Sequence, residues 1–377
     1  MKKELEIVGK DYGGQAEEVK YPLYINNYLD IIKIFLKINE KRGRYEEGLG
    51  NREDELGHYH MDPHDMGNVI TIVGRRGSGK TTVIQEMRSI LKNFNLCKKD
   101  WFQEIGEPYA SELKGQIDKE YYVDAMEIID ASVLEEKDDL LEIILWYMYE
   151  QVSKKIDLAK SAGFTNANNW ELGNFTKSVD EVYRMHQSIK GKRQEERGES
   201  VVTLLDNMPN SIRTRRAMGK LIEAYLKIMY PGKENSAYLL IPIDDLDLNI
   251  RKGYQMLEEI RRYLLDWRII VLLAVDYEQM EKVCENRFRK EFENGQGIYE
   301  EELNKHIRNL SDSYMIKVFP ISHRIYLTEK SLKSSYIKEM NNDKVEMYQI
   351  KEYLLTKISE KMGIYYDAYG LKTHFCV

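Results

Sequence analysis

A glycine-rich stretch of the chain, NVITIVGRRGSGKTTVIQEM, has the residue types that bind a phosphate group. Within it, Gly74 to Thr81 fits the pattern G-x-x-x-x-G-K-[ST]. The glycines allow backbone N–H groups to turn inward, and the helix expected to follow points its positive end at the same place. We expect Lys80 to contact the β- and γ-phosphates and the Thr81 hydroxyl to bind Mg²⁺. The candidate nucleotide-binding residues are Gly74, Arg75, Arg76, Gly77, Ser78, Gly79, Lys80, Thr81 and Thr82.

The surroundings of this stretch distinguish a phosphate site from a chance glycine turn. An apolar, β-branched run precedes the loop and a helical pattern follows it, which is the order that a phosphate loop requires. The pattern does not require Arg75 or Arg76. These two side chains are expected either to be solvated or to touch a neighbour.

A second candidate group follows the apolar run of YLLIPIDDLDLN. An acid at the end of a strand beside a phosphate loop can hold Mg²⁺ through its water shell, and a second acid can orient or deprotonate an attacking water. We assign Asp244 to the metal and Asp245 to the water, and expect Asp247 to serve a turn or a helix cap. Pro242 conflicts with a strand because it lacks a ladder donor, so the strand either bulges there or does not need this N–H group.

Two later residues are candidates for chemistry at the γ-phosphate. Asp276 ends the apolar run IIVLLAVD, where it can either sense the γ-phosphate and the water or cap the next helix. Arg308, in KHIRNL, can either reach a nucleotide held by an adjacent subunit or lie on the surface. Weaker candidates for the work of Arg308 are Arg261, Arg262 and Arg324. The candidate catalytic residues are Lys80, Asp245, Asp276 and Arg308.

These residues need strands that end at one edge of a sheet. Apolar runs predict five strands, at residues 69–73, 121–129, 237–243, 269–275 and 314–319. Helical spacing predicts helices at residues 24–38, 82–91 and 211–229, whereas residues 42–68 have the composition of a loop. Alternating strands and helices predict an α/β fold with a parallel sheet covered on both faces.

Composition suggests three parts of the chain. Residues 1–66 are expected to form a helical and loop extension, and residues 67–327 the phosphate-binding domain. A polar stretch at about residues 153–210 is interpreted as a helical insertion in that domain. Residues 328–377 are expected to form a helical segment, the beginning of a lid or of a region that couples to an effector.

Charge and cysteine content exclude several classes of protein. The net charge of −7 argues against a broadly basic nucleic-acid binder, although a local basic patch stays open. Cys97, Cys284 and Cys376 are scattered and odd in number, which favours a reducing cytosol over a disulfide framework. The start of the chain lacks the apolar core of a signal peptide, and no run reaches membrane-spanning length. We therefore expect a cytoplasmic protein without membrane contact.

Three further stretches have a functional and a structural interpretation. His58, His60 and His64 in GHYHMDPH have the residue type of a metal cluster, but they occur in a polar loop. KGKRQEERGE, residues 190–199, mixes both signs of charge and is typical of a solvated face. The basic residues of SIRTRRAMGK fit either a nucleic-acid or partner site or one face of an exposed helix.

Together, the phosphate loop, IDDLD, LEEIRRYLLDWRIIVLLAVD and SYMIKVFPI resemble the KAP-type and STAND P-loop NTPases, close to the AAA+ group. The resemblance covers roughly residues 68–327. It implies a five-stranded sheet in the order 5-1-4-3-2 and arginines that act between subunits. KAP proteins often carry membrane helices within the domain, and this sequence has none.

A finer resemblance concerns IPIDDLDLN, EEIRRYLLDWRIIVLLAVDYEQ and YMIKVFPISHRIYL. These stretches look like the soluble ATPase of the bacterial RADAR antiphage system. That resemblance implies assembly into a homo-oligomeric ring and a partner effector encoded nearby. Such ATPases usually continue well past this length, so we expect a truncated or naturally short form.

The sequence thus predicts an ATP-binding and Mg²⁺-dependent ATP-hydrolysing module that switches an assembly, in antiviral defence or signalling. ATP is favoured over GTP because an N-K-x-D motif is absent and Asp244 does not begin a D-x-x-G pattern. Two alternatives stay open: a nucleotide-dependent scaffold with little hydrolysis, and an ATPase stimulated by nucleic acid. A small-molecule kinase would need an acceptor pocket and a mobile lid, for which the sequence has no signature.

Overall fold

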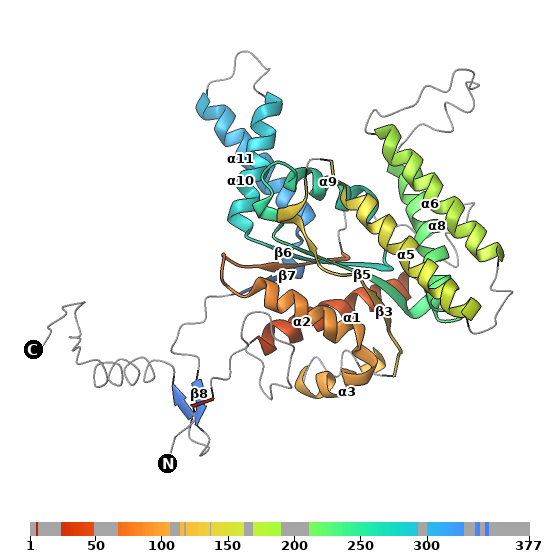
Figure 1. Ribbon diagram of the computed structural model, residues 1–377. Helices are drawn as coiled ribbons and strands as arrows, with labels where there is room; N and C mark the ends of the chain where they lie inside the picture. The colour runs from red at the N-terminus through yellow and green to blue at the C-terminus, as the bar shows by residue number, and fades with distance from the viewer. Residues whose placement is uncertain are drawn as a thin grey trace, which may run out of the picture. The chain divides into compact units, whose positions relative to one another are not determined.

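The computed structural model describes residues 5–6, 24–48, 67–105, 114–116, 118–135, 137–161, 169–189, 211–292, 300–327, 336–339 and 344–346. The chain divides into two compact units, of which the larger is Asn26–Leu327 and the smaller combines Met1–Ile25 with Thr328–Val377. The larger unit carries the predicted site and is shown in Figure 1.

The larger unit is built on a parallel sheet, as predicted, but the sheet has six strands and not five. Its hydrogen-bonded path runs β3-β5-β6-β2-β7, and β4 pairs with β5 beside that path. The strands are β2 (Val69–Val73), β3 (Tyr122–Ala125), β4 (Ile129–Asp130), β5 (Ala237–Asp244), β6 (Ile269–Val275) and β7 (Arg324–Tyr326). Two of the five strands in the predicted order 5-1-4-3-2 therefore need correction.

The first correction concerns the strand predicted at residues 314–319, which is instead the end of helix α11 (Glu300–Val318). Ile307, Ser311, Met315 and Val318 are all buried, and this spacing of three to four residues is that of a helix. The strand that pairs with β2 on the side away from β6 is β7, in the register Thr71 to Arg324.

The second correction concerns residues 121–129, which form two short strands because Pro242 lies opposite the break between them. Leu240 accepts a hydrogen bond from the Met126 N–H at 3.0 Å, so Leu240 and, two residues on, Pro242 present their backbone groups to this side. β3 pairs with β5 up to Leu240, and β4 resumes the pairing at Ile243. The missing N–H of Pro242 thus faces the interruption, while β5 continues through it without a bulge.

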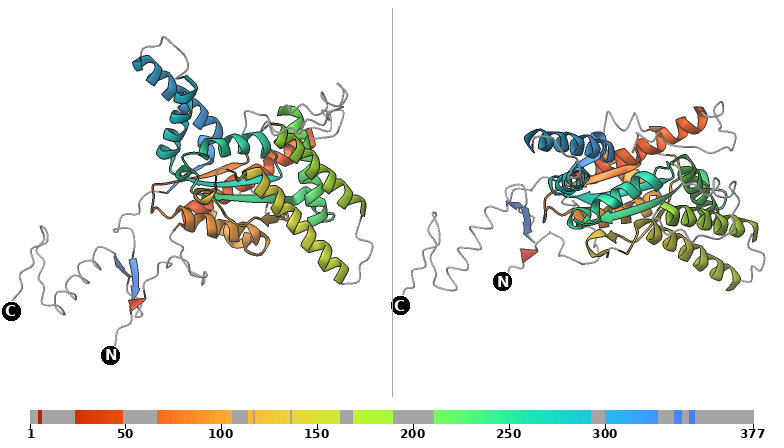
Figure 2. Two further views of the ribbon diagram at one scale, coloured as in Figure 1. Left: turned by 45° about the horizontal axis from the view of Figure 1, so that its top comes forward. Right: turned by 90° about the horizontal axis from the view of Figure 1, so that it is seen from above.

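Helices cover both faces of the sheet (Figures 1 and 2). On one face lie α1 (Ile25–Gly48), α2 (Lys80–Lys92) and α3 (Phe94–Ile105). The other face packs against α5 (Leu140–Ser161), α8 (Ser211–Met229), α9 (Gly253–Tyr263) and α10 (Tyr277–Phe292). Short 3₁₀ turns lie at Lys114–Gln116, Ala131–Val133, Glu234–Ser236, Leu246–Leu248 and Ile321–His323.

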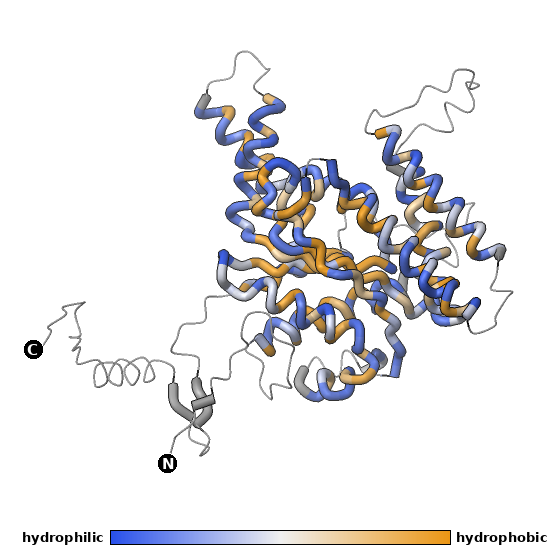
Figure 3. The backbone as a smooth tube through the Cα atoms, viewed as in Figure 1, coloured by the Kyte–Doolittle hydropathy of each residue, from blue (hydrophilic) through white to orange (hydrophobic). Residues whose placement is uncertain are grey.

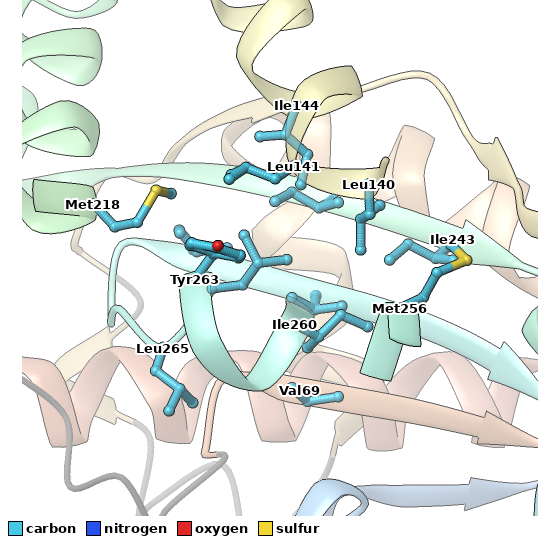
Figure 4. Close-up of a cluster of buried hydrophobic side chains, with 14 of the residues drawn as sticks. Val69, Leu140, Leu141, Ile144, Met218, Ile243, Met256, Ile260, Tyr263 and Leu265 are labelled. Atoms are coloured by element: carbon cyan, nitrogen blue, oxygen red, sulfur yellow. The ribbon is translucent and has the colours of Figure 1, made fainter. Parts of the chain in front are cut away.

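The central strands are buried along their whole length, which is why their sequences are continuous apolar runs. Alternate residues serve opposite faces. Val69 and Ile243 face the helices α5, α8 and α9, and they join the cluster of side chains shown in Figure 4. In the tube of Figure 3 the strands form an apolar band between polar outer helix faces.

Helix α1 is longer than predicted, because it continues to Gly48 through residues assigned to a loop. Its apolar stripe of Tyr28, Ile31, Ile32, Phe35, Leu36 and Ile38 is at most 1% exposed. The Phe35 ring lies 5.5–5.6 Å, centroid to centroid, from the rings of Phe94, Tyr121 and Tyr238. At the far end, Arg42 donates to the Ala237 carbonyl at 3.1 Å. The helix therefore belongs to the same core as the sheet.

The polar stretch predicted as an insertion begins inside α5, which runs unbroken to Ser161. It continues in α6 (Asn169–Ile189), which packs against α8, and residues 190–210 lie outside the described residues. α8 has the predicted bounds, and α2 begins two residues earlier than predicted, at Lys80.

The smaller unit contains an antiparallel sheet in the order β1-β8-β9, formed by Leu5–Glu6, Tyr336–Glu339 and Lys344–Glu346. A helical segment was predicted for residues 328–377, so the strands β8 and β9 contradict it where residues are described. Ile337 pairs with Val345, and β-branched residues of this kind favour strands. None of the described helices is both long enough and apolar enough to cross a membrane.

Candidate nucleotide site at the sheet edge

The loop between β2 and α2 is shaped by three glycines. Gly77 and Gly79 have left-handed φ angles of 80° and 90°, which other residues rarely adopt. A Cβ added to Gly74 would lie 2.3 Å from the Ser78 Oγ atom, so a side chain there would force the Ser78 side chain to move. The Gly74 N–H donates to the Val275 carbonyl of β6 at 3.1 Å, which ties the loop to the neighbouring strand.

Lys80, the first residue of α2, is buried and lies across this loop. Its Nζ atom donates to the Gly74 carbonyl at 3.0 Å and to the Arg75 carbonyl at 3.4 Å. The ammonium group is thus held at the mouth of the loop by weak neutral acceptors. A phosphate oxygen would be a stronger acceptor for the same charge.

Asp244 and Thr81, predicted to bind the metal together, lie close enough for the Thr81 hydroxyl to lower the pKa of the Asp244 carboxyl. Burial raises the pKa of Asp244, while the Thr81 hydrogen bond and the charge of Lys80 act in the opposite direction. The carboxylate and the hydroxyl are the hard oxygen ligands that Mg²⁺ prefers. The residues present therefore fit an Mg²⁺ ion carried by a nucleotide.

Asp245, assigned to the water, begins the 3₁₀ turn after β5 in an unusual conformation. Its φ of 53° is left-handed, which is uncommon for a residue other than glycine. Its N–H donates to the Asp244 Oδ1 atom at 2.9 Å. Backbone outliers of this kind occur often at functional sites.

Asp247 is closer to the site than the sequence indicated. It is 3% exposed, and its Oδ1 atom accepts a hydrogen bond from the Asp276 N–H at 2.9 Å. Burial raises its pKa, and the Asp276 N–H and the Lys80 charge oppose that shift. No local pattern indicated this position, because the contact joins Asp247 to Asp276 at the end of β6.

Asp276 lies where β6 ends and has the capping role that the sequence left open. Its Oδ1 atom accepts the Gln279 N–H of α10 at 3.3 Å. Its backbone links the ends of β5 and β6 through Asp247. Sensing of the γ-phosphate by Asp276 remains a prediction.

Some of the candidate arginines are exposed, and another makes contacts within the fold. Arg75 and Arg76 are exposed, and Arg75 lies 3.8 Å from Glu278 in a solvated pair worth little energy. Arg308 is exposed on α11. Arg324 lies 4.5 Å from the Tyr277 ring centroid and donates to the Phe319 carbonyl, so packing already uses it.

The remaining sequence candidates have mixed outcomes. His58, His60 and His64, and the stretch 190–199, lie outside the described residues. The arginines of SIRTRRAMGK are half-buried on α8, where an exposed face was one of the two expectations. Cys97 and Cys284 are free thiols.

The site can be compared with known protein families once its geometry is described. The model of the KAP family P-loop domain matches residues 56–308, a segment that contains the loop, the three acids and Arg308. No curated protein matches the chain.

Proposed function

The chain belongs to the KAP family of P-loop domains, and from this premise we propose that it binds ATP with Mg²⁺ and hydrolyses the β–γ bond. The observation that carries the proposal is the convergence of Lys80, Thr81 and Asp244. Helix α2, which begins with Lys80 and Thr81, packs against β5, which ends at Asp244. The Thr81 hydroxyl and the Lys80 charge both lower the pKa of that carboxyl. The absence of the two guanine-type motifs supports ATP over GTP.

In this proposal each residue has a separate task. Lys80 exchanges its carbonyl contacts for phosphate oxygens, and the backbone N–H groups of the loop contact the same phosphates. Thr81 and Asp244 hold Mg²⁺, which when bound neutralises charge that develops on the phosphates. Asp245 orients the attacking water. The left-handed backbone of Asp245 supports this task, because it turns the chain away from the strand direction at the sheet edge.

We extend the proposal to an assembly in which Arg308 completes the site of an adjacent subunit. Its support is the exposure of Arg308 on α11, together with the sequence resemblance to AAA+ relatives. Such a ring would be cytoplasmic and would switch an effector protein in defence or signalling. For that finer role the support is the motif resemblance to the RADAR ATPase.

The test measures binding and turnover separately with the full chain. Titration with ATP and GTP gives the affinities, and phosphate release with and without Mg²⁺ gives the rate. The proposal predicts tighter binding of ATP and release that requires Mg²⁺. Binding without release would instead identify a scaffold, and release that rises on adding DNA or RNA would identify a nucleic-acid-stimulated ATPase. Failure to bind either nucleotide would overturn the proposal.

A further inference from the structure

A second cluster of chemically active side chains lies away from the phosphate loop, where α5, α6 and α9 meet. Asp139 and Glu142 stand at the start of α5, and His186 stands near the end of α6. One possible ligand atom from each lies within 4.8 Å of the other two. Asp139 is 2% and His186 3% exposed. The His186 Nε2 and Asp139 Oδ2 atoms are 3.6 Å apart.

The geometry points to a binding site for a divalent cation of the zinc type, held by Asp139, Glu142 and His186. Nothing in the nucleotide chemistry uses these residues, so this proposal stands apart from the ATPase function. Its first support is ligand chemistry: imidazole together with carboxylate is a common zinc donor set, whereas Mg²⁺ favours oxygen ligands alone.

The second support is distance. Two ligand atoms that are each about 2.0–2.1 Å from a tetrahedral Zn²⁺ lie roughly 3.3–3.5 Å apart. The 3.6 Å between Nε2 and Oδ2 is close to this spacing and beyond the usual length of a hydrogen bond. A small closure of Glu142 would bring the third ligand to the same ion.

The third support is the set of outer contacts. In each of the three side chains, an uncharged neighbour contacts a polar atom other than the one proposed to bind the metal. The Nδ1 atom of His186 lies 2.9 Å from the Tyr263 hydroxyl. Gln255 donates to the Asp139 Oδ1 atom at 3.3 Å. Outer contacts of this kind orient the ligands of metal sites, and when the second nitrogen of a histidine ligand donates, its first nitrogen keeps a lone pair for the metal.

Glu142 has the same kind of outer contact. Its Oε1 atom accepts from the Gln187 side chain at 2.9 Å, next to His186 in the chain. The buried Glu259 adds another carboxylate nearby and accepts the Leu141 N–H at 3.3 Å. Several carboxylates therefore gather around a buried imidazole, and a dication would balance their charge.

The simpler occupant of this cluster is a proton. In that case His186 is an imidazolium paired with Asp139, and the cluster is a buried ion pair at the start of α5. The two occupants differ in metal content. A bound metal would link the start of α5 to α6, and the outer contacts of Tyr263 and Gln255 would join this link to α9.

The experiment uses the purified full chain without nucleotide and measures its metal content and its affinity for Co²⁺ by visible absorption. We expect about one equivalent of Zn²⁺ per chain, replaceable by Co²⁺ with the spectrum of a tetrahedral site. His186→Gln should weaken Co²⁺ binding at least tenfold, since loss of an outer partner alone costs about 10–100-fold. Zn²⁺ should raise the melting temperature of the wild type and not that of the variant.

Three variants control the result. His306→Gln makes the same change on an exposed histidine of α11 and should keep the metal. A variant with His58, His60 and His64 all changed to Gln should keep it too, which separates this cluster from the histidine-rich loop. Glu142→Gln, at a half-buried position, replaces His186→Gln if that variant does not fold, and the same tenfold loss is expected.

Two results would overturn the proposal. One is wild-type protein that contains no metal and binds no Co²⁺, which would leave the buried ion pair as the occupant. The other is wild-type Co²⁺ affinity in folded His186→Gln or Glu142→Gln protein.

Discussion

The sheet edge around Lys80 and the helical pair α10–α11 carry their charges in opposite ways. At the sheet edge Asp244 and Asp247 are buried, and hydrogen-bond donors together with the Lys80 charge stabilise them. On the helical pair the charges are largely exposed, and the neighbouring acid Asp312 raises the pKa of Glu281. The pair extends from the sheet in Figure 1.

This difference indicates which functions one chain can supply alone. A buried site is set by contacts within the chain, so binding should depend on the chain itself. An exposed arginine such as Arg308 gains a defined position only from a partner. We therefore expect changes at the sheet edge to act on binding and chemistry in every subunit, and changes on α11 to act through assembly.

The largest effect is expected for Lys80→Ala. It should remove the β/γ-phosphate contact and abolish ATP binding while the fold stays intact, because the loop glycines and α2 remain. Nucleotide titration measures the loss, and circular dichroism confirms the fold. Lys92→Ala, at the other end of α2, is the matched control and should bind normally. Wild-type affinity in Lys80→Ala would break the assignment of the loop.

The next effect distinguishes the acids. Asp245→Asn should keep ATP bound and slow hydrolysis by about 10²–10⁴-fold, the usual contribution of a general base. Asp244→Asn should in addition weaken the dependence on Mg²⁺. Single-turnover phosphate release measures both.

Asp247→Asn sharpens that prediction. Its buried carboxylate accepts the Asp276 N–H, so this variant should be less stable and only indirectly slower. Normal hydrolysis in Asp245→Asn together with a loss in Asp247→Asn would show that Asp247 positions the water.

On the helical pair, Arg308→Ala should leave ATP binding almost unchanged and lower turnover by about 10²–10³-fold, as for removal of one donor to transition-state charge. Mixing it with Lys80→Ala should restore part of the activity, because each chain then supplies what the other lacks. Phosphate release across a range of protein concentrations measures this. Wild-type turnover of Arg308→Ala, or turnover independent of concentration, would count against action between subunits.

The smallest effect concerns pH. The hydrogen bond to Asp312, burial, and the charges of Asp312, Glu285 and Glu278 raise the pKa of Glu281 to about 7. The folded state then favours the protonated acid, so the stabilisation is complete below the usual pKa of 4.5 and is lost as pH rises through about 7.

The melting temperature of Glu281→Gln relative to wild type should therefore increase between pH 5 and pH 8 (about the range set by the two pKa values). Solvent screens a partly exposed carboxyl, which keeps the change small. Glu302→Gln, exposed on α11, should show no such trend. If the difference in melting temperature between Glu281→Gln and wild type does not change with pH, the raised pKa of Glu281 is refuted.

The phosphate loop and the central strands could be predicted from sequence because their requirements are local. Strand β2 has the predicted bounds, and Gly77 and Gly79 occupy conformations that favour glycine. The apolar run up to Asp244 could be assigned to a strand without knowledge of its neighbouring strands, since a strand buried on both faces is apolar throughout.

Other features depend on distant residues. The break between β3 and β4 depends on Pro242, about a hundred residues later in the chain. The prediction of a strand at residues 314–319 was wrong. A short apolar run fits the periodicity of a strand and that of a buried helix, and only tertiary packing decides between them. The role of Asp247 depends on Asp276, which follows β6, and no local pattern contains that contact.

Helix α1 has a consequence for expressing parts of the protein. The family match begins at residue 56, after this helix, yet the helix buries six apolar side chains against the sheet. Each would forfeit about 1.5–3 kcal/mol on exposure. A fragment trimmed to the matched segment would expose the apolar surface that α1 covers. We expect such a fragment to aggregate when it is expressed. Soluble expression should begin upstream of Ile25.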